Sequence, residues 1–159
     1  MMLNNHEWPR NTLDNMTDSI IKTAKLLRQK SSSPMVPSPD PEAHVRFKNG
    51  TSRHDVGVDG SMRESDATDL FLINNIDAAR VWNCALAIPE IGGLGIYFDS
   101  QVGGQKRVLF HIDNRPDRLM WVCPSRKRSK ESRSYIYFRE DNPSAFLEIL
   151  AHEFDKLRR

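Results

Sequence analysis

The sequence predicts a single α+β domain in which a mostly antiparallel sheet packs against helices. Strand-like apolar runs follow one another between residues 94 and 138, and segments of helical periodicity precede and follow them. No internal repeat is visible, and 159 residues are enough for one buried core. We expect residues 1–16 to form an irregular N-terminal arm and residues 17–159 to form the domain.

The first part of the domain is expected to contain one helix and long loops. Apolar residues recur at helical spacing over residues 17–29, and Thr17 is a favourable N-cap. Residues 31–42 contain three consecutive serines and four prolines, and this composition predicts a loop. A short strand is expected over residues 44–47, and the glycines and charges of residues 52–65 predict a long exposed loop.

The second part alternates helix and strand before a final helix. A buried strand is expected over residues 68–72, followed by a helix over residues 76–88 with Ile76 among its core residues. The last helix is the clearest element, because Asn142 is an N-cap and Pro143 occupies the first helical position. Four further strands are expected at residues 94–98, 108–112, 119–122 and 135–138.

Composition and charge exclude several classes of protein. The mean hydropathy is −0.58, and no apolar run approaches the ~20 residues of a membrane span. The N-terminus has no apolar core that could serve as a secretory signal. Cys84 and Cys123 lack a Cys-x-x-Cys partner and are expected to be free thiols. A net charge of +2 does not predict nucleic-acid binding, although residues 126–133 are locally basic and leave a nucleic-acid-binding regulator as an alternative.

Three short segments contain the side chains that bind metals. They read Ser52-Arg53-His54, Ser65-Asp66-Ala67-Thr68-Asp69 and Phe110-His111-Ile112-Asp113. Two imidazoles, one carboxylate and an open position form a ligand set typical of hydrolytic zinc. Residues i and i+2 of a strand point to the same face, so His111 and Asp113 are expected to point into one pocket as a ligand and a proton carrier. The alternative interpretation is a structural histidine in a strand.

The order of further motifs along the chain matches a known pattern. The Ser-x-His and Ala-x-Asp segments are followed by Gly92-Gly93-Leu94-Gly95-Ile96-Tyr97, by Phe110-His111-Ile112-Asp113-Asn114-Arg115 and by Trp121. Over roughly residues 45 to 123, this order resembles the zinc D-alanyl-D-alanine carboxypeptidase-like peptidases, a superfamily that includes phage L-alanyl-D-glutamate endolysins.

The resemblance implies a hedgehog/DD-peptidase-like fold and a zinc-dependent peptidase that hydrolyses peptidoglycan stem peptides in cell-wall lysis or remodelling. Such a protein would be cytoplasmic or associated with a virion. The zinc ligands implied are His54, Asp69 and His111. Asp113 is then the expected catalytic proton carrier, and the expected substrate contacts are Arg115, Ser52, Tyr97 and Trp121.

Two features depart from the family pattern. The gap between His54 and Asp69 is longer than in the family, because residues 57–64 resemble an insertion in which Asp59 is a competing ligand. Val108 stands where the endolysins have a carboxylate, so the proton carrier is Asp113 or another acid such as Asp99. A non-catalytic phage structural or binding module on the same fold is therefore a further alternative.

Overall fold

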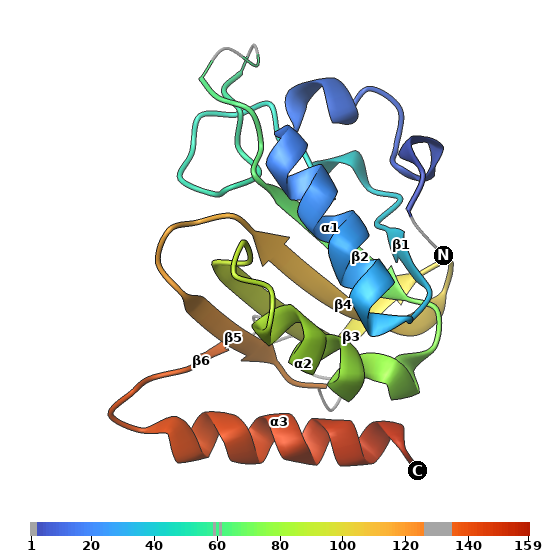
Figure 1. The fold of residues 1–159 in the computed structure, drawn as a ribbon, viewed down its shortest axis with the longest axis vertical. Coiled ribbons are helices and arrows are strands. Elements are labelled where there is room, and N and C mark those ends of the chain that lie inside the picture. The colour runs from blue at the N-terminus through green and yellow to red at the C-terminus, as the bar shows by residue number, and fades with distance from the viewer. Residues whose placement is uncertain (1–2, 59, 61, 126–134) are drawn as a thin grey trace.

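A mostly antiparallel sheet is the central element of the computed structural model, which describes residues 3–58, 60, 62–125 and 135–159 (Figure 1). Within these residues the sheet has six strands in the order β1-β2-β4-β3-β5-β6. Every neighbouring pair is antiparallel except β3 and β5, which are parallel. The expected α+β class is confirmed. The strands are β1 Met35–Pro37, β2 Ala67–Leu72, β3 Gly93–Val102, β4 Gln105–Asp113, β5 Leu119–Cys123 and β6 Ile136–Tyr137.

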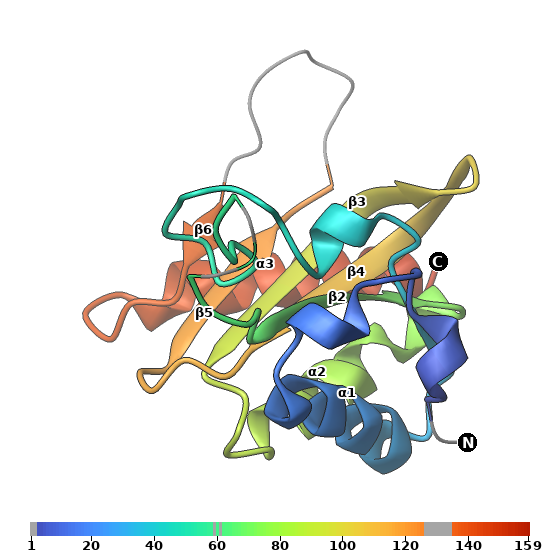
Figure 2. The same cartoon turned by 90° about the horizontal axis from the view of Figure 1, so that it is seen from above.

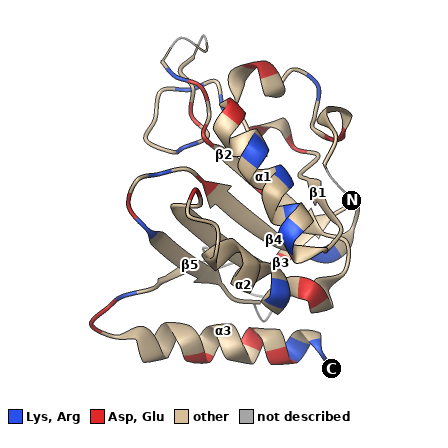
Figure 3. Cartoon of the chain, viewed as in Figure 1, with Lys and Arg blue, Asp and Glu red and all other residues tan. Residues whose placement is uncertain are grey.

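Among the described residues there are three α-helices; the first two lie against one face of the sheet (Figure 2), and the third packs against the same core. Most inward side chains of the strands on this face are buried, and they share one core with apolar residues of every helix. Charged residues occur on the loops and on the first and last helices (Figure 3). The helices are α1 Asp18–Ser31, α2 Ala78–Leu86 and α3 Pro143–Leu157.

The helix ends follow the expected signals with one exception. The Thr17 hydroxyl accepts a hydrogen bond from the backbone N–H of Ile20 and begins α1. Pro143 lies in the first turn of α3, as expected. The helix expected over residues 76–88 is shorter, because a 3-10 turn, η4 Asn75–Asp77, precedes α2. Ile76 lies on this turn and is 60% exposed, so the expectation that it joins the core is wrong.

The N-terminal segment, expected to be an irregular arm, is packed into the domain from residue 3 onward. It contains two 3-10 turns, η1 Asn5–Glu7 and η2 Leu13–Asn15. Leu3, Trp8 and Met16 are buried in the same core as α1, although their spacing follows no regular period. Irregular apolar spacing is why the sequence pattern did not predict this packing.

The other face of the sheet is covered by the chain between β1 and β2 (Figure 2). The strand expected over residues 44–47 does not form, because His44 ends the 3-10 turn η3 Pro41–Ala43 and only one β-bridge follows. Residues 54–57 are buried, so the expectation of a long exposed loop over residues 52–65 is wrong for this part. The buried Asp55 carboxylate accepts a hydrogen bond from the Ser52 backbone N–H and holds the loop in place.

Strand register brings the chemically distinctive side chains into one row across this second face. Asp69 of β2 pairs with His111 of β4, His111 pairs with Gly95 of β3, and Gly95 pairs with Trp121 of β5. Directly paired residues point to the same face, so the row is continuous. A Cβ added at Gly95 would lie 2.3 Å from Cε2 of Trp121. Glycine is therefore required there by the flat packing of the indole ring and not by a turn.

Gly95→Ala is expected to lower the free energy of unfolding by about 1–3 kcal/mol, because the added methyl group overpacks Trp121. Urea unfolding of both proteins measures the change. The matched control is Gly103→Asn, at a turn where a Cβ meets nothing within 4 Å and Asn tolerates the left-handed conformation. Equal losses for the two variants would contradict the packing argument.

Candidate metal centre

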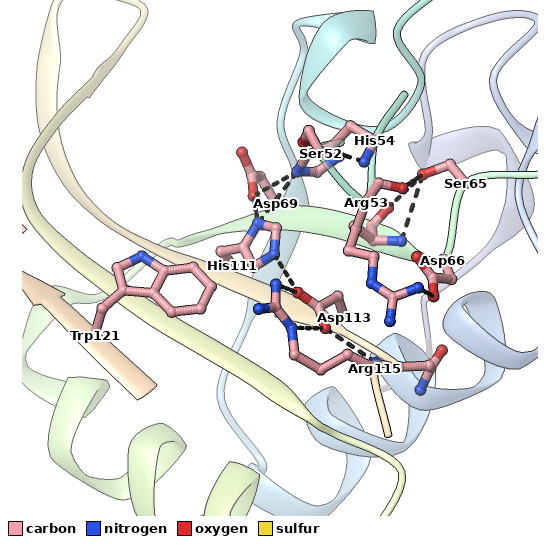
Figure 4. A network of polar contacts seen from close by, with 12 residues as sticks. Ser52, Arg53, His54, Ser65, Asp66, Asp69, His111, Asp113, Arg115 and Trp121 are labelled. Atoms are coloured by element: carbon pink, nitrogen blue, oxygen red, sulfur yellow. Dashed lines mark hydrogen bonds and ion pairs between the residues drawn. The ribbon is translucent and has the colours of Figure 1, made fainter. Parts of the chain in front are cut away.

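Three side chains expected to bind zinc converge on one point in the structure (Figure 4). Asp69 and His111 come from the paired strands β2 and β4, and His54 comes from the loop that covers them. Nε2 of His54 lies 3.2 Å from Nδ1 of His111 and 3.8 Å from Oδ1 of Asp69. The same Nδ1 and Oδ1 atoms are 2.9 Å apart. The residues are close enough to hold a metal ion.

The triangle formed by these three atoms fits a metal with tetrahedral coordination. Ligands at the usual zinc distances of about 2.0–2.1 Å are separated from one another by about 3.3 Å. The observed separations between the three ligand atoms are 2.9, 3.2 and 3.8 Å, so they lie on both sides of that value. His54 and His111 are both buried, with 3% and 7% exposure, so the backbone and the core hold the triangle in place.

Each histidine is oriented by a partner on the side of its ring that faces away from the triangle. Nε2 of His111 lies 3.0 Å from Oδ2 of Asp113, and Nδ1 of His54 lies 3.4 Å from the carbonyl oxygen of His44. Both partners accept hydrogen bonds, which assigns the proton of each neutral ring to the outer nitrogen. The lone pairs of the inner nitrogens then both point toward the Asp69 carboxylate. Such an arrangement is unfavourable unless a proton or a metal ion lies among the three groups.

The pKa values agree with this requirement. Burial and the charge of the neighbouring His111 together lower the pKa of His54 to about 4, although the Asp69 carboxylate acts in the opposite direction. Burial would also lower the pKa of His111, but hydrogen bonds to Asp113 and Asp69 outweigh it and raise the pKa to about 9. Burial raises the pKa of Asp69, but the hydrogen bond from His111 and the charges of the neighbouring histidines together lower this pKa below its usual value. In the metal-free protein, a proton on His111 therefore supplies the positive charge.

Asp113 differs from its expected role as proton carrier. Its side chain is completely buried and lies beyond His111, on the opposite side of that ring from Asp69 and His54. Burial raises the pKa of Asp113, but hydrogen bonds from His111 and Arg115 lower it far below the usual range. The geometry is that of a carboxylate that orients a metal-binding histidine.

Arg115 is also committed within the protein. Its Nε and Nη2 atoms both donate to the Asp113 carboxylate, and its guanidinium lies 5.7 Å from the centre of the Trp121 ring. The expected bidentate contact of Arg115 with a substrate carboxylate would have to replace this pair. Arg115 nevertheless lines the cavity beside the candidate metal centre.

His44 is a residue of the site that sequence reasoning missed. It is completely buried, with Nδ1 2.7 Å from Oγ1 of Thr68 and Nε2 2.8 Å from the carbonyl oxygen of Ser38. These contacts fix the carbonyl group that orients His54. Its pattern in the sequence was that of a lone histidine after a proline-rich loop, and only the tertiary contacts distinguish it.

The open side of the triangle faces a cavity of about 690 Å³. All four expected substrate contacts, Ser52, Tyr97, Arg115 and Trp121, line this cavity. Ser52 also accepts a hydrogen bond from the His54 backbone N–H within the loop. Asp99, the alternative acid, is not among the lining residues and forms an ion pair with Lys106. The structure describes neither Asp59 nor residues 126–134. The competing ligand Asp59 and the basic residues 126–133 therefore lie outside the described part of the chain.

Comparisons with protein-family models, with curated proteins and with solved structures give no match to this chain. Among the described residues, no helix has the length and apolar character needed to cross a membrane. Cys84 and Cys123 do not form a disulfide, as expected.

The stability of the metal-free protein is expected to fall as the pH rises from about 6.5 through about 9, because His111 binds its proton more tightly when folded than when unfolded. His54 acts in the opposite direction, but only below about pH 6.5, where the unfolded chain takes up the proton. Urea unfolding of chelator-treated protein at several pH values measures the effect. Zinc-loaded protein is the control, since zinc replaces the proton; unchanged stability of the metal-free form across this range would contradict the assignment.

Asp113→Asn is expected to weaken zinc binding about 10- to 100-fold, because the variant loses the carboxylate that orients His111. Competition with a chromogenic chelator measures the affinity. The matched control is Asp66→Asn, which removes a carboxylate paired with Arg53 and not with a ligand. If Asp113 only carried protons, the variant would bind zinc as tightly as the wild type and lose turnover alone.

Proposed function

We propose that the protein is a zinc-dependent peptidase that hydrolyses peptidoglycan stem peptides in cell-wall lysis or remodelling. The observation that carries the proposal is the triangle of His54, Asp69 and His111, which has its open side toward a large cavity. A structural zinc site is usually closed by four protein ligands, whereas a catalytic site keeps a position open. The hedgehog/DD-peptidase-like fold and the family membership are part of the same proposal.

Zinc is the metal that this donor set favours. Two imidazole nitrogens and one carboxylate oxygen form a borderline ligand set, whereas magnesium and calcium prefer oxygen ligands throughout. The neutral form of both rings binds metal, and their outer nitrogens already have acceptors in Asp113 and the His44 carbonyl group. When bound to such a set, zinc acts as a Lewis acid and makes water a nucleophile near neutral pH.

The remaining residues of the cavity supply binding and proton transfer. Asp40 and Glu42 line it, and the Asp40 carboxylate is engaged by the backbone N–H of Glu42. The Glu42 carboxylate is therefore the acid that we assign as proton carrier in place of Asp113. Arg46 and Arg53 also line the cavity, and their charges suit a stem peptide that carries carboxylates.

The experiment that tests the proposal combines metal analysis with a cleavage assay. Protein purified without chelator is expected to contain one zinc per chain and to release new amines from purified peptidoglycan. His54→Ala and His111→Ala are expected to lose zinc and cleavage together. The matched control is His152→Ala, which changes an exposed histidine on α3 and leaves both unchanged.

Two further variants locate the proton carrier. Glu42→Gln is expected to retain zinc and to lose about 10²–10⁴-fold in turnover. Asp99→Asn is expected to retain both, since Asp99 pairs with Lys106 outside the cavity. Protein that holds zinc but cleaves nothing would favour a non-catalytic module, and protein that cannot be loaded with zinc would remove the basis of the proposal.

A further inference from the structure

Four aromatic side chains form a continuous surface along one side of the cavity, which we call the aromatic wall; they are Tyr97, Trp121, Tyr135 and Tyr137. Ring centres are 6.0 Å apart for Tyr97 and Tyr135, 6.5 Å for Tyr135 and Tyr137, and 6.4 Å for Tyr137 and Trp121. Trp121 Nε1 donates a hydrogen bond to the Tyr97 hydroxyl, 3.0 Å away, so that each of the four rings contacts two of the others. The four rings are therefore mutually supported.

The aromatic wall begins at the metal centre and ends in solvent. The Trp121 ring centre lies 5.0 Å from that of His111, and Trp121 is only 7% exposed. Tyr135 and Tyr137, by contrast, are 41% and 49% exposed. Large aromatic groups with this much exposure beside a metal centre are available to a ligand.

The side chains from the chain between β1 and β2 give the same cavity a different character. Ser38, Asp40, Glu42 and Arg46 line the cavity and present hydroxyl, carboxylate and guanidinium groups. A ligand that fills the space must therefore offer an apolar face to the rings and several hydrogen-bonding groups elsewhere.

We propose that the aromatic wall binds a pyranose ring of the glycan strand, so that the substrate is a peptide still attached to its sugar. One face of a pyranose ring presents C–H groups, which meet the negative face of an aromatic ring favourably. Its hydroxyl and acetamido groups lie at the ring edge and need the polar partners found on the other lining residues. The inference rests on the proposed function and names the substrate more closely.

The stem peptide alone does not account for the aromatic wall. Its side chains are methyl groups, carboxylates and amines, which are too small or too polar to cover Tyr135 and Tyr137. A nucleotide would also stack on the rings, but its phosphates would meet the carboxylates of Asp40 and Glu42 as well as Arg46, whereas a neutral sugar needs no match of charge. The sugar satisfies both sets of lining residues.

The position of the aromatic wall also indicates which bond is cut. Because the rings start beside His111, a sugar bound against them places the nearest amide bonds of the attached peptide at the metal centre. We therefore expect cleavage at the first or second amide bond counted from the sugar and not at the distal end of the stem peptide.

The test compares two substrates that differ only in the sugar: N-acetylmuramoyl-L-alanyl-D-isoglutamine and O-methyl-lactyl-L-alanyl-D-isoglutamine. The zinc-loaded protein is expected to show a kcat/KM about tenfold higher for the sugar-bearing compound, the scale of one good aromatic contact. Tyr137→Ala should remove this preference by lowering only the sugar-bearing value. Tyr137→Phe should keep it, and Phe47→Ala, an exposed aromatic residue outside the cavity lining, should leave both values unchanged.

A second measurement does not depend on catalysis. Calorimetric titration of the zinc-free protein with the N-acetylglucosamine tetramer is expected to show binding that Tyr137→Ala weakens about tenfold. Oligo(dT) is titrated in parallel, and its binding in place of the tetramer would overturn the inference in favour of nucleic acid.

The outcomes separate the two proposals. Equal kcat/KM values for the two compounds would overturn the sugar site and leave the peptidase intact. Tetramer binding without any cleavage would support the sugar site and remove the peptidase. The absence of both binding and cleavage would overturn both.

Discussion

The structure depends on the convergence of two imidazole lone pairs and one carboxylate on a single point. Nδ1 of His111, Nε2 of His54 and Oδ1 of Asp69 lie within 3.8 Å of one another, which is unfavourable unless a proton or a metal ion lies between them. The pairing of β2 with β4 fixes two of these groups, and the loop before β2 delivers the third. The raised pKa of His111, about 9, shows how strongly the site attracts positive charge.

One face of the sheet contributes to the hydrophobic core, and the other face carries the side chains of the candidate site. Leu70, Phe110 and Ile96 on the helix side are completely buried and belong to the core. The alternate positions carry Asp69, His111 and Gly95, where the glycine leaves room for Trp121. Because side chains alternate along a strand, a shift of one residue in register would exchange the two sets. The core that excludes water on one side therefore also enforces the geometry of the site on the other.

Much of this arrangement could be predicted from the sequence, and the failures have physical causes. Periodicity predicted α1, α3 and the strands that carry Asp69 and His111, because period and burial are local properties. The ligand trio came from motif order, and the structure brings the three residues together. The role of His44 and the burial of residues 54–57 escaped prediction, because both depend on contacts across the fold. Asp113 was placed on the correct face, yet only the ring orientation of His111 shows that it lies beyond the ligand.

The origin of His54 in a loop has a consequence for how tightly the site would hold a metal ion. Two ligands are fixed by the sheet, but His54 is in place only while its loop is docked, which depends on Asp55 and on Arg63, whose guanidinium donates to the carbonyl oxygens of Asp55 and Ser52. The apparent affinity for the ion equals the intrinsic affinity multiplied by the docked fraction of the loop. The dissociation constant of such an ion would therefore also report the docking of the loop, and residues that do not contact the ion would set part of its value.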